Sequence, residues 1–197
     1  MFHRLVASWV YGGFLAGLLL LAPTPLFAAG WDGATTLVFL ALPVYMIHQY
    51  EEHDADRFRR FVNARLGGGR EILTLVDVFW INIVGVWVLL AADVWFAAHL
   101  DIGWGVFAAY FLLVNATLHI VQAIHLRCYN PGLGTAVALF LPLGFAEFAT
   151  LQPVATLAQS LIGAGVTLVV YAAIIARVRS RLRASQSTTE MTRPLAS

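Results

Sequence analysis

The sequence predicts an all-α protein, a polytopic bundle of about six transmembrane helices, and three observations lead to that prediction. Of the 197 residues, 60% are hydrophobic and only 12% are charged, whereas an average soluble domain has about 25% charged residues. Several apolar runs reach the roughly 20 residues that a helix needs to cross a membrane. The basic residues cluster between alternate runs. So little charge excludes a water-soluble globule, and so much hydrophobicity excludes a disordered chain.

The apolar runs define the expected helices in chain order. Glycine and proline inside them are compatible with this reading, because both are more frequent in membrane helices than in soluble ones. The first run has some features of a signal peptide, but it is long and Leu26 and Phe27 suit a cleavage site poorly, so we expect it to be retained. The six expected helices cover residues 5–27, 35–53, 72–98, 104–126, 133–151 and 154–176.

These helices form one predicted transmembrane domain, residues 1–184, followed by a polar tail, residues 185–197. The tail is rich in serine and threonine and has no helical period, so we expect it to be disordered. The single cysteine, Cys128, excludes an intrachain disulfide and a cysteine-based zinc motif.

The arginines predict the orientation of the bundle. All twelve basic residues are arginines, and a six-helix topology puts every one of them on the same side of the membrane. The positive-inside rule assigns that side to the cytoplasm. We therefore expect a multi-pass protein of the inner membrane with both termini cytoplasmic. The arginines are Arg4, Arg57, Arg59, Arg60, Arg65, Arg70, Arg127, Arg177, Arg179, Arg181, Arg183 and Arg193.

A cluster of ionisable residues lies at the cytoplasmic end of the second predicted helix. Such groups are costly inside a membrane and mark functional sites. His48, Glu51 and Glu52 stand at positions i, i+3 and i+4, so their side chains share one face of the helix. An imidazole and carboxylates so placed suit a metal ion. His53 adds a further imidazole that could orient one of these ligands.

The fourth predicted helix supplies a matching polar stripe. Asn115, His119, Gln122 and His125 advance in steps of four, three and three residues, which places them on one side of an otherwise apolar helix. At 1.5 Å per residue, His119 lies about 12 Å from the cytoplasmic end of its helix and His48 about 8 Å from the end of its own. The two clusters are therefore expected in one layer, to which the third helix adds Asp77.

This layer predicts a site for a divalent transition metal, either one ion or two, with iron or zinc as the candidates. Its residues are also compatible with metal-free acid–base catalysis by Glu51 or Glu52 with His119, with a proton or ion relay, and with hydrogen bonds that only hold the bundle together. Glu52 and Asn115 are the candidate catalytic residues, while His53, Asp77 and Gln122 would orient the ligands. The predicted ligands are His48, Glu51, Glu52, His119 and His125.

Two further carboxyls and one turn complete the polar features of the chain. Glu147 lies deep in the fifth helix, about 21 Å from its start, either as a member of the site or as a partner of another buried polar group. Asp93 falls at the outer end of the third helix, where we expect an interfacial position. The segment from Tyr129 to Gly132 is typical of a tight turn between helices four and five.

Three short motifs resemble the HXXEE family of small bacterial membrane proteins. They are His48-Gln49-Tyr50-Glu51-Glu52, the Asn115-Ala116-Thr117-Leu118-His119 element, and the Tyr129-Asn130-Pro131-Gly132 turn with the Thr135-Ala136 pair that follows it. The resemblance implies a multi-helix membrane protein with a suspected metal-dependent activity. It also implies that His48, Glu51, Glu52, Asn115 and His119 belong to the site.

A second resemblance, to intramembrane CAAX-type proteases, breaks down at two positions. Arg57 falls one residue late after the glutamate pair, and Asn115 stands where those proteases have phenylalanine.

The function predicted from these observations is a membrane-embedded, metal-dependent oxidoreductase or hydrolase. Its substrate would be a hydrophobic or amphipathic small molecule that arrives from the inner leaflet of the bilayer. Mixed histidine and carboxylate ligation favours iron slightly over zinc. The alternatives are a proton-coupled transporter and a structural membrane subunit that use the same polar layer. No nucleic-acid partner is expected, and the sequence does not predict an oligomeric state.

Overall fold

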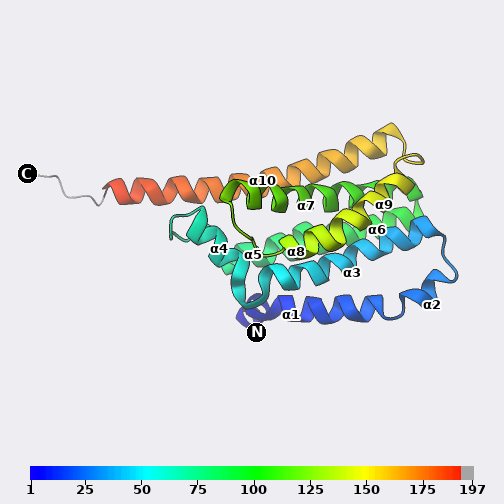
Figure 1. Cartoon of the computed structure of the whole chain (residues 1–197), viewed down its shortest axis with the longest axis horizontal. Helices are drawn as coiled ribbons and strands as arrows, with labels where there is room; N and C mark the ends of the chain where they lie inside the picture. The colour runs from blue at the N-terminus through cyan, green and yellow to red at the C-terminus, as the bar shows by residue number, and fades with distance from the viewer. Residues whose placement is uncertain (192–197) are drawn as a thin grey trace, which may run out of the picture.

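The computed structural model describes the backbone of residues 1–191 and the side chains of residues 1–184. Within this part all regular structure is helical, which confirms the predicted fold class. Six helical passes run alternately along one axis, and the chain enters through α1 and leaves through α10 at the same end of the bundle (Figure 1).

Four passes are single α-helices, and two contain a π-helical turn, in which the helix is locally wider. The single helices are α1 (Phe2–Leu21), α3 (Gly33–His53), α7 (Val106–Leu126) and α10 (Leu157–Met191). The third pass consists of α5 (Leu75–Asn82), a π-helical turn Ile83–Val88 and α6 (Leu89–His99). The fifth consists of α8 (Leu133–Thr135), a π-helical turn Ala136–Phe140 and α9 (Leu141–Leu151). Two short helices, α2 (Thr24–Ala28) and α4 (Arg57–Arg65), lie at the ends of the bundle, and 3₁₀ turns span Asp54–Asp56 and Ile102–Gly105.

Five of these stretches are long and apolar enough to cross a membrane: Phe2–Ala28, Leu75–His99, Ile102–Leu126, Leu133–Leu151 and Leu157–Ala184. The remaining pass, α3, which is the second in chain order, has the length at 21 residues, but His48, Gln49 and Tyr50 lower its hydropathy. This helix packs against α1, α6 and α9 and so lies inside the bundle. The structure is therefore that of a helical membrane protein whose most polar pass is covered by the others.

The termini of α3 and α8 show how local sequence fixes the helices that carry the site. The Asp32 carboxylate accepts a hydrogen bond from the backbone N–H of Thr35, at 2.6 Å, and so caps the N-terminus of α3. After α7, Arg127 adopts a left-handed φ of 50°, and Gly132 follows with a φ of 95° immediately before α8. These two residues reverse the chain, as the predicted turn requires.

The hydrophobic core lies between α3, α6, α7 and the fifth pass. Tyr45, Phe111, Leu112 and Phe140 are at most 3% exposed, and their packing fixes α3 and α7 relative to each other. A second, smaller core lies under α4, where Val62 packs with Ile72, Leu73 and Val78. The helix α4 therefore folds back over the end of the bundle, as its place in Figure 1 shows.

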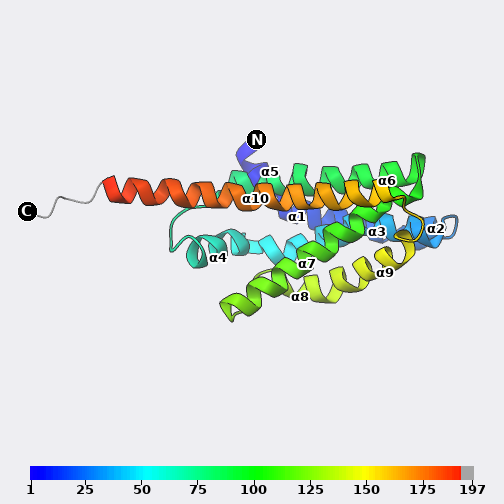
Figure 2. The same ribbon diagram turned by 90° about the horizontal axis from the view of Figure 1, so that it is seen from above.

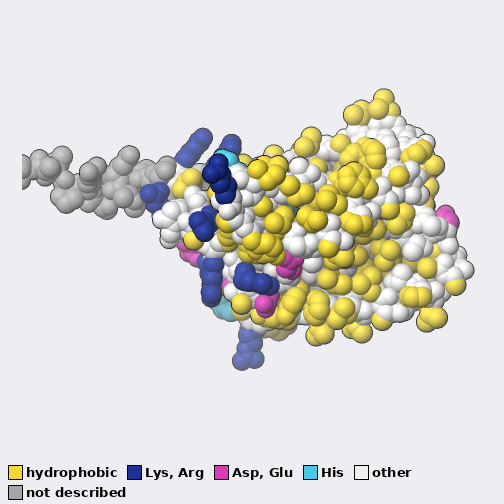
Figure 3. Space-filling view, in the orientation of Figure 1, with side chains coloured by type: hydrophobic (Ala, Val, Ile, Leu, Met, Phe, Trp, Pro, Cys, Tyr) yellow, Lys and Arg dark blue, Asp and Glu magenta, His cyan; other side chains and the backbone are white. Residues whose placement is uncertain are grey.

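Charge is segregated along the long axis of the molecule. Arginine side chains gather at the end where α10 leaves the bundle, and the flank between the two ends is hydrophobic (Figure 3). The helix α10 is described as far as Met191, so helical backbone continues into the segment predicted to be disordered. Residues 192–197 lie outside the described part of the chain, and the prediction for them stays a prediction.

Candidate metal centre

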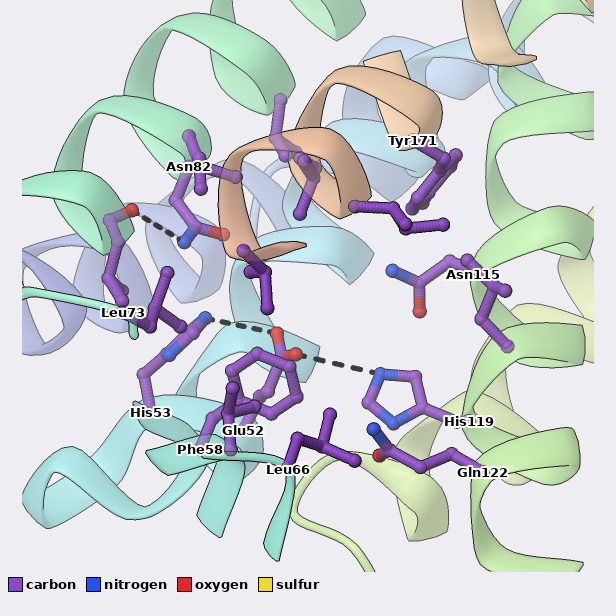
Figure 4. A pocket seen from close by; sticks show the side chains of 18 of the residues that line it. Glu52, His53, Phe58, Leu66, Leu73, Asn82, Asn115, His119, Gln122 and Tyr171 are labelled. Carbon is purple, nitrogen blue, oxygen red and sulfur yellow. Dashed lines mark hydrogen bonds and ion pairs between the residues drawn. The ribbon is translucent and has the colours of Figure 1, made fainter. Parts of the chain in front are cut away.

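Three buried side chains from two helices converge on one point. His48 and Glu52 stand one turn apart on α3, and His119 faces them from α7. The Nε2 atoms of His48 and His119 each lie 3.6 Å from a different oxygen of the Glu52 carboxylate. The three ligand atoms lie within 4.8 Å of one another, and the residues are only 0–7% exposed. Figure 4 shows Glu52 between His119 and His53 at the wall of a pocket.

The proton on the His48 ring is placed by Thr135. His48 Nδ1 lies 2.8 Å from the Thr135 hydroxyl oxygen. That hydroxyl donates its only hydrogen to Glu51 at 2.5 Å, with the Gly132 carbonyl, another acceptor, at 3.4 Å. Since the hydroxyl proton is already committed, His48 Nδ1 must be the donor in the bond to Thr135. The lone pair of the ring is therefore on Nε2, which faces Glu52.

The same logic fixes the ring of His119. The side-chain amide of Asn130 donates from Nδ2 to the His119 backbone carbonyl at 2.8 Å, and a carbonyl can only accept. The other atom of this amide, Oδ1, is thus an acceptor, and it lies 2.7 Å from His119 Nδ1. His119 Nδ1 must donate to it, which leaves the lone pair of this ring on Nε2 as well.

Two imidazole lone pairs therefore point at one carboxylate in a buried space. His48 Nε2 has no hydrogen-bond partner, and an unpartnered buried polar atom is costly. Neutral imidazoles that donate Nδ1–H to a second group while Nε2 stays free have the arrangement of metal-ligating histidines. The residues present therefore fit a divalent metal ion held by His48, Glu52 and His119.

His53 supports Glu52 from the side opposite to His119. Its Nε2 lies 3.0 Å from Glu52 Oε2, and an N–H at that atom donates to the carboxylate. The ring of Phe58, from α4, contacts the ring of His53 with centroids 5.5 Å apart. The last turn of α3 and the start of α4 thus surround the Glu52 carboxylate on this side, and the orienting role of His53 stays a prediction.

The backbone at Gly132 comes unusually close to both imidazoles. A Cβ at this position would lie 2.7 Å from His119 Cε1 and 2.9 Å from His48 Cε1, closer than real Cβ contacts. Its φ of 95° is also one that favours glycine. A side chain at residue 132 would therefore displace the rings that carry the two Nε2 ligand atoms.

Glu51 does not join the three-residue group. Its carboxylate turns toward the start of the fifth pass, where it accepts hydrogen bonds from Tyr129, from the backbone N–H of Gly134 at 3.1 Å and from Thr135. Partial burial and the adjacent Glu51 raise the pKa of the Tyr129 hydroxyl, so this hydroxyl stays protonated and donates. Glu51 therefore anchors the turn and, through Thr135, the ring of His48.

A pocket of about 580 Å³ opens onto this group. Glu52, His53 and His119 form its polar wall together with Asn115, and most of its other lining is apolar (Figure 4). Asn115 Nδ2 donates to the Tyr45 hydroxyl at 2.7 Å, whereas its buried Oδ1 has no partner. Asn115 therefore presents an unused hydrogen-bond acceptor at the pocket.

The remaining predicted site residues lie outside the three-residue group. Gln122 lines the pocket beside His119 (Figure 4). His125 lines the pocket as well, but it is exposed. Asp77 instead forms a capping box with Thr74 at the start of α5 and an ion pair with Arg177 at 3.0 Å. The ligand role of His125 and the orienting role of Asp77 stay predictions.

Two carboxyls lie elsewhere in the bundle. Glu147 is fully buried, and neither of its oxygens has a hydrogen-bond partner. Asp93 is 5% exposed, so its side chain is buried between helices, and the interfacial depth expected for it stays a prediction. Its carboxyl faces the backbone N–H of Ala108 in the first turn of α7.

Sequence reasoning missed the residues that orient the two histidines. Asn130 and Thr135 were assigned to a turn and to the pair that follows it, and not to the site. The available signal was the motif itself, because both residues belong to the third motif that resembles the HXXEE family.

The fold and this group define a class: helical membrane proteins that carry a buried histidine–glutamate cluster capable of holding a metal ion. A family model described as "Protein of unknown function with HXXEE motif" matches residues 39–146, and the chain belongs to this family. Searches of curated proteins and of solved structures returned no match.

Proposed function

We propose that the chain is a membrane-embedded, metal-dependent enzyme that acts on a lipidic or amphipathic substrate. The observation that carries the proposal is the commitment of both Nδ1–H groups, to Thr135 and to Asn130, which leaves two Nε2 lone pairs facing Glu52. A purely structural polar cluster would not leave His48 Nε2 without a partner.

His48, Glu52 and His119 would hold the ion, and the favoured ion is iron(II). Two imidazoles and one carboxylate are the donor set of non-haem iron oxygenases, although some hydrolytic zinc sites have it too. Bound iron would supply oxygen activation, whereas bound zinc would supply hydrolytic chemistry. The apolar pocket beside the group favours iron, because it would present an apolar part of a substrate for oxidation.

The chain's own residues would position that substrate. The Asn115 Oδ1 atom would accept a hydrogen bond from it, and the apolar walls would exclude water from around the Glu52 carboxylate. His53, donating to Glu52 Oε2, would keep the Glu52 carboxylate from rotating. The Arg-rich end of the bundle supports the inner membrane as the location, with the site on the cytoplasmic side.

Metal analysis of the purified protein tests the proposal. We expect one equivalent of iron or zinc, lost in His48→Ala and in His119→Ala while the helical circular dichroism is unchanged. His99→Ala is the matched control: this histidine is exposed in the last turn of α6 and does not line the pocket, so the variant should keep its metal. A metal-free wild-type protein that retains its activity would overturn the proposal. Proton-linked uptake into vesicles, abolished by Glu52→Gln, would instead support the transporter alternative.

A further inference from the structure

The wall of the pocket formed by α10 carries a positively charged side chain. Arg179 lines the pocket, and an arginine is always charged. Its neighbours Arg177 and Arg181 pair with Asp77, at 3.0 and 3.9 Å. Among the described residues no acidic oxygen lies within 4.0 Å of Arg179. The pocket therefore contains a guanidinium without an ionic partner among residues 1–184.

Helix register places Arg179 at the depth of the candidate metal centre. The fourth and sixth passes run in the same direction, and they meet where the Tyr171 hydroxyl donates to the Phe111 carbonyl at 3.4 Å. His119 and Arg179 each lie eight residues beyond that contact, or about 12 Å further along their helices. Figure 2 shows α7 and α10 diverging toward this end, and the pocket lies between them. Arg179 and His119 thus occupy opposite walls at a similar depth.

The rest of the lining is suited to an apolar chain. Ile72, Leu73 and Val78 are buried beneath α4 and form one wall. At the rim, Leu118 and Val121 of α7 and Ile175 of α10 are 38–55% exposed within stretches apolar enough to span a membrane. An exposed apolar rim at this position gives a ligand access from the lipid side.

We propose that the pocket binds a single-chain anionic amphiphile. Its carboxylate or phosphate group would be held by the Arg179 guanidinium, across from His119, and its apolar chain would lie along the walls. A volume of about 580 Å³ falls in the range of small-molecule pockets, about 300–1,000 Å³, which suits one chain. The proposal that this amphiphile is the substrate rests on the proposed function. It adds that the head end lies beside Glu52 and His119, so the apolar part presented to the site is the part of the chain next to the head group.

Binding of defined probes tests this assignment in the purified full-length chain. The probes share a sixteen-carbon chain (the length of a common membrane acyl chain) and differ in the head: palmitate, hexadecyl phosphate and the neutral alcohol hexadecanol. We expect at least one acid to bind more tightly than the alcohol. Arg179→Gln should weaken binding of that acid about tenfold, the value of one charge-assisted hydrogen bond, and leave the alcohol unchanged. The tighter of the two acids identifies the head group.

Arg183→Gln is the matched control, because Arg183 lies one turn further along α10 and does not line the pocket. It should bind every probe as the wild type does, and Arg179→Lys should retain most of the preference for the acid. Equal binding of acids and alcohol, or equal losses in Arg179→Gln and Arg183→Gln, would overturn the assignment. Metal content measured on the same samples keeps the two proposals separate: a metal-free wild type that still prefers the acids contradicts only the proposed function, and a loaded protein without that preference contradicts only this inference.

Discussion

At the scale of single residues, the site depends on groups that never touch a bound ion. Glu51 accepts hydrogen bonds from the turn and from Thr135, and Thr135 accepts from His48. Asn130 performs the same task for His119 through one amide with two partners. The HXXEE glutamates therefore have separate tasks: Glu52 faces the imidazoles, and Glu51 fixes the chain that orients one of them.

Thr135→Val tests this division of tasks. Valine has nearly the shape of threonine but cannot accept the proton of His48 Nδ1, so the ring loses its orientation. Metal affinity should fall about 10- to 100-fold, the usual cost of losing such a partner, as measured by competition with a chelator. Thr117→Val is the control, because the Thr117 hydroxyl donates to the carbonyl of Leu113 in its own helix and has no part in the metal group. Equal affinities in the two variants would contradict the orienting role of Thr135.

Gly132→Ala should abolish metal binding for a steric reason. The added Cβ would meet both imidazole rings at under 3 Å, and the rings would have to move apart. Gly68→Ala provides a matched control, since Gly68 also has a positive φ, of 60°, but open space around it. Both variants should lose about 1–2 kcal/mol of unfolding free energy to backbone strain. Only Gly132→Ala should also lose its metal, and retention of the metal there would contradict the close packing.

At the scale of helices, the sequence predicted what depends on local pattern. Apolar runs located all six passes, because a membrane helix satisfies its own backbone and needs only length and hydropathy. The runs did not reveal the π-helical turns, and at Ala136–Phe140 such a turn brings the Phe140 ring to 4.2 Å from the ring of His48. A wider turn of this kind depends on packing against other helices, which no local pattern records.

The choice between Glu51 and Glu52 was undecidable from sequence for a geometric reason. Successive residues are rotated by about 100° around an α-helix, so positions i+3 and i+4 flank His48 on opposite sides. Which side faces α7 depends on the rotation of the whole of α3, which tertiary contacts set. His119 and His48 were predicted to share a layer, because depth along a helix follows from residue counts alone.

Glu147 of α9 and Glu51 of α3 should respond to the same substitution with opposite signs. Glu147 is buried with both oxygens unpartnered, so Glu147→Met removes a costly group and should raise the free energy of unfolding by about 1–3 kcal/mol. Glu51→Met removes an acceptor that holds Tyr129, Gly134 and Thr135 and should lower it. Thermal unfolding in detergent measures both changes. A clear loss in Glu147→Met would contradict this reading and show that its carboxyl has a partner in the folded protein.

At the scale of the whole molecule, charge and apolarity are distributed so that one end of the bundle differs from the other. The candidate centre lies near the Arg-rich end, where α4 covers the pocket with Phe58 and Val62. An arginine-rich surface attracts anionic lipid headgroups, and the same positive charge would attract an anionic amphiphile toward the rim of the pocket. The segregation of charge thus places the arginines at the same end of the bundle as the pocket proposed to bind an anion.

This orientation can be measured with the chain's single cysteine. Cys128 lies at the Arg-rich end, between α7 and α8, and is partly exposed. If that end is cytoplasmic, a membrane-impermeant maleimide should label Cys128 in inverted vesicles and not in intact spheroplasts. The control is Thr156→Cys in a Cys128→Ala background, because residue 156 lies in the turn before α10 at the opposite end and should show the reverse pattern. Labelling of Cys128 from outside intact spheroplasts would reverse the topology and place the candidate metal centre, with its pocket, on the outer side of the membrane.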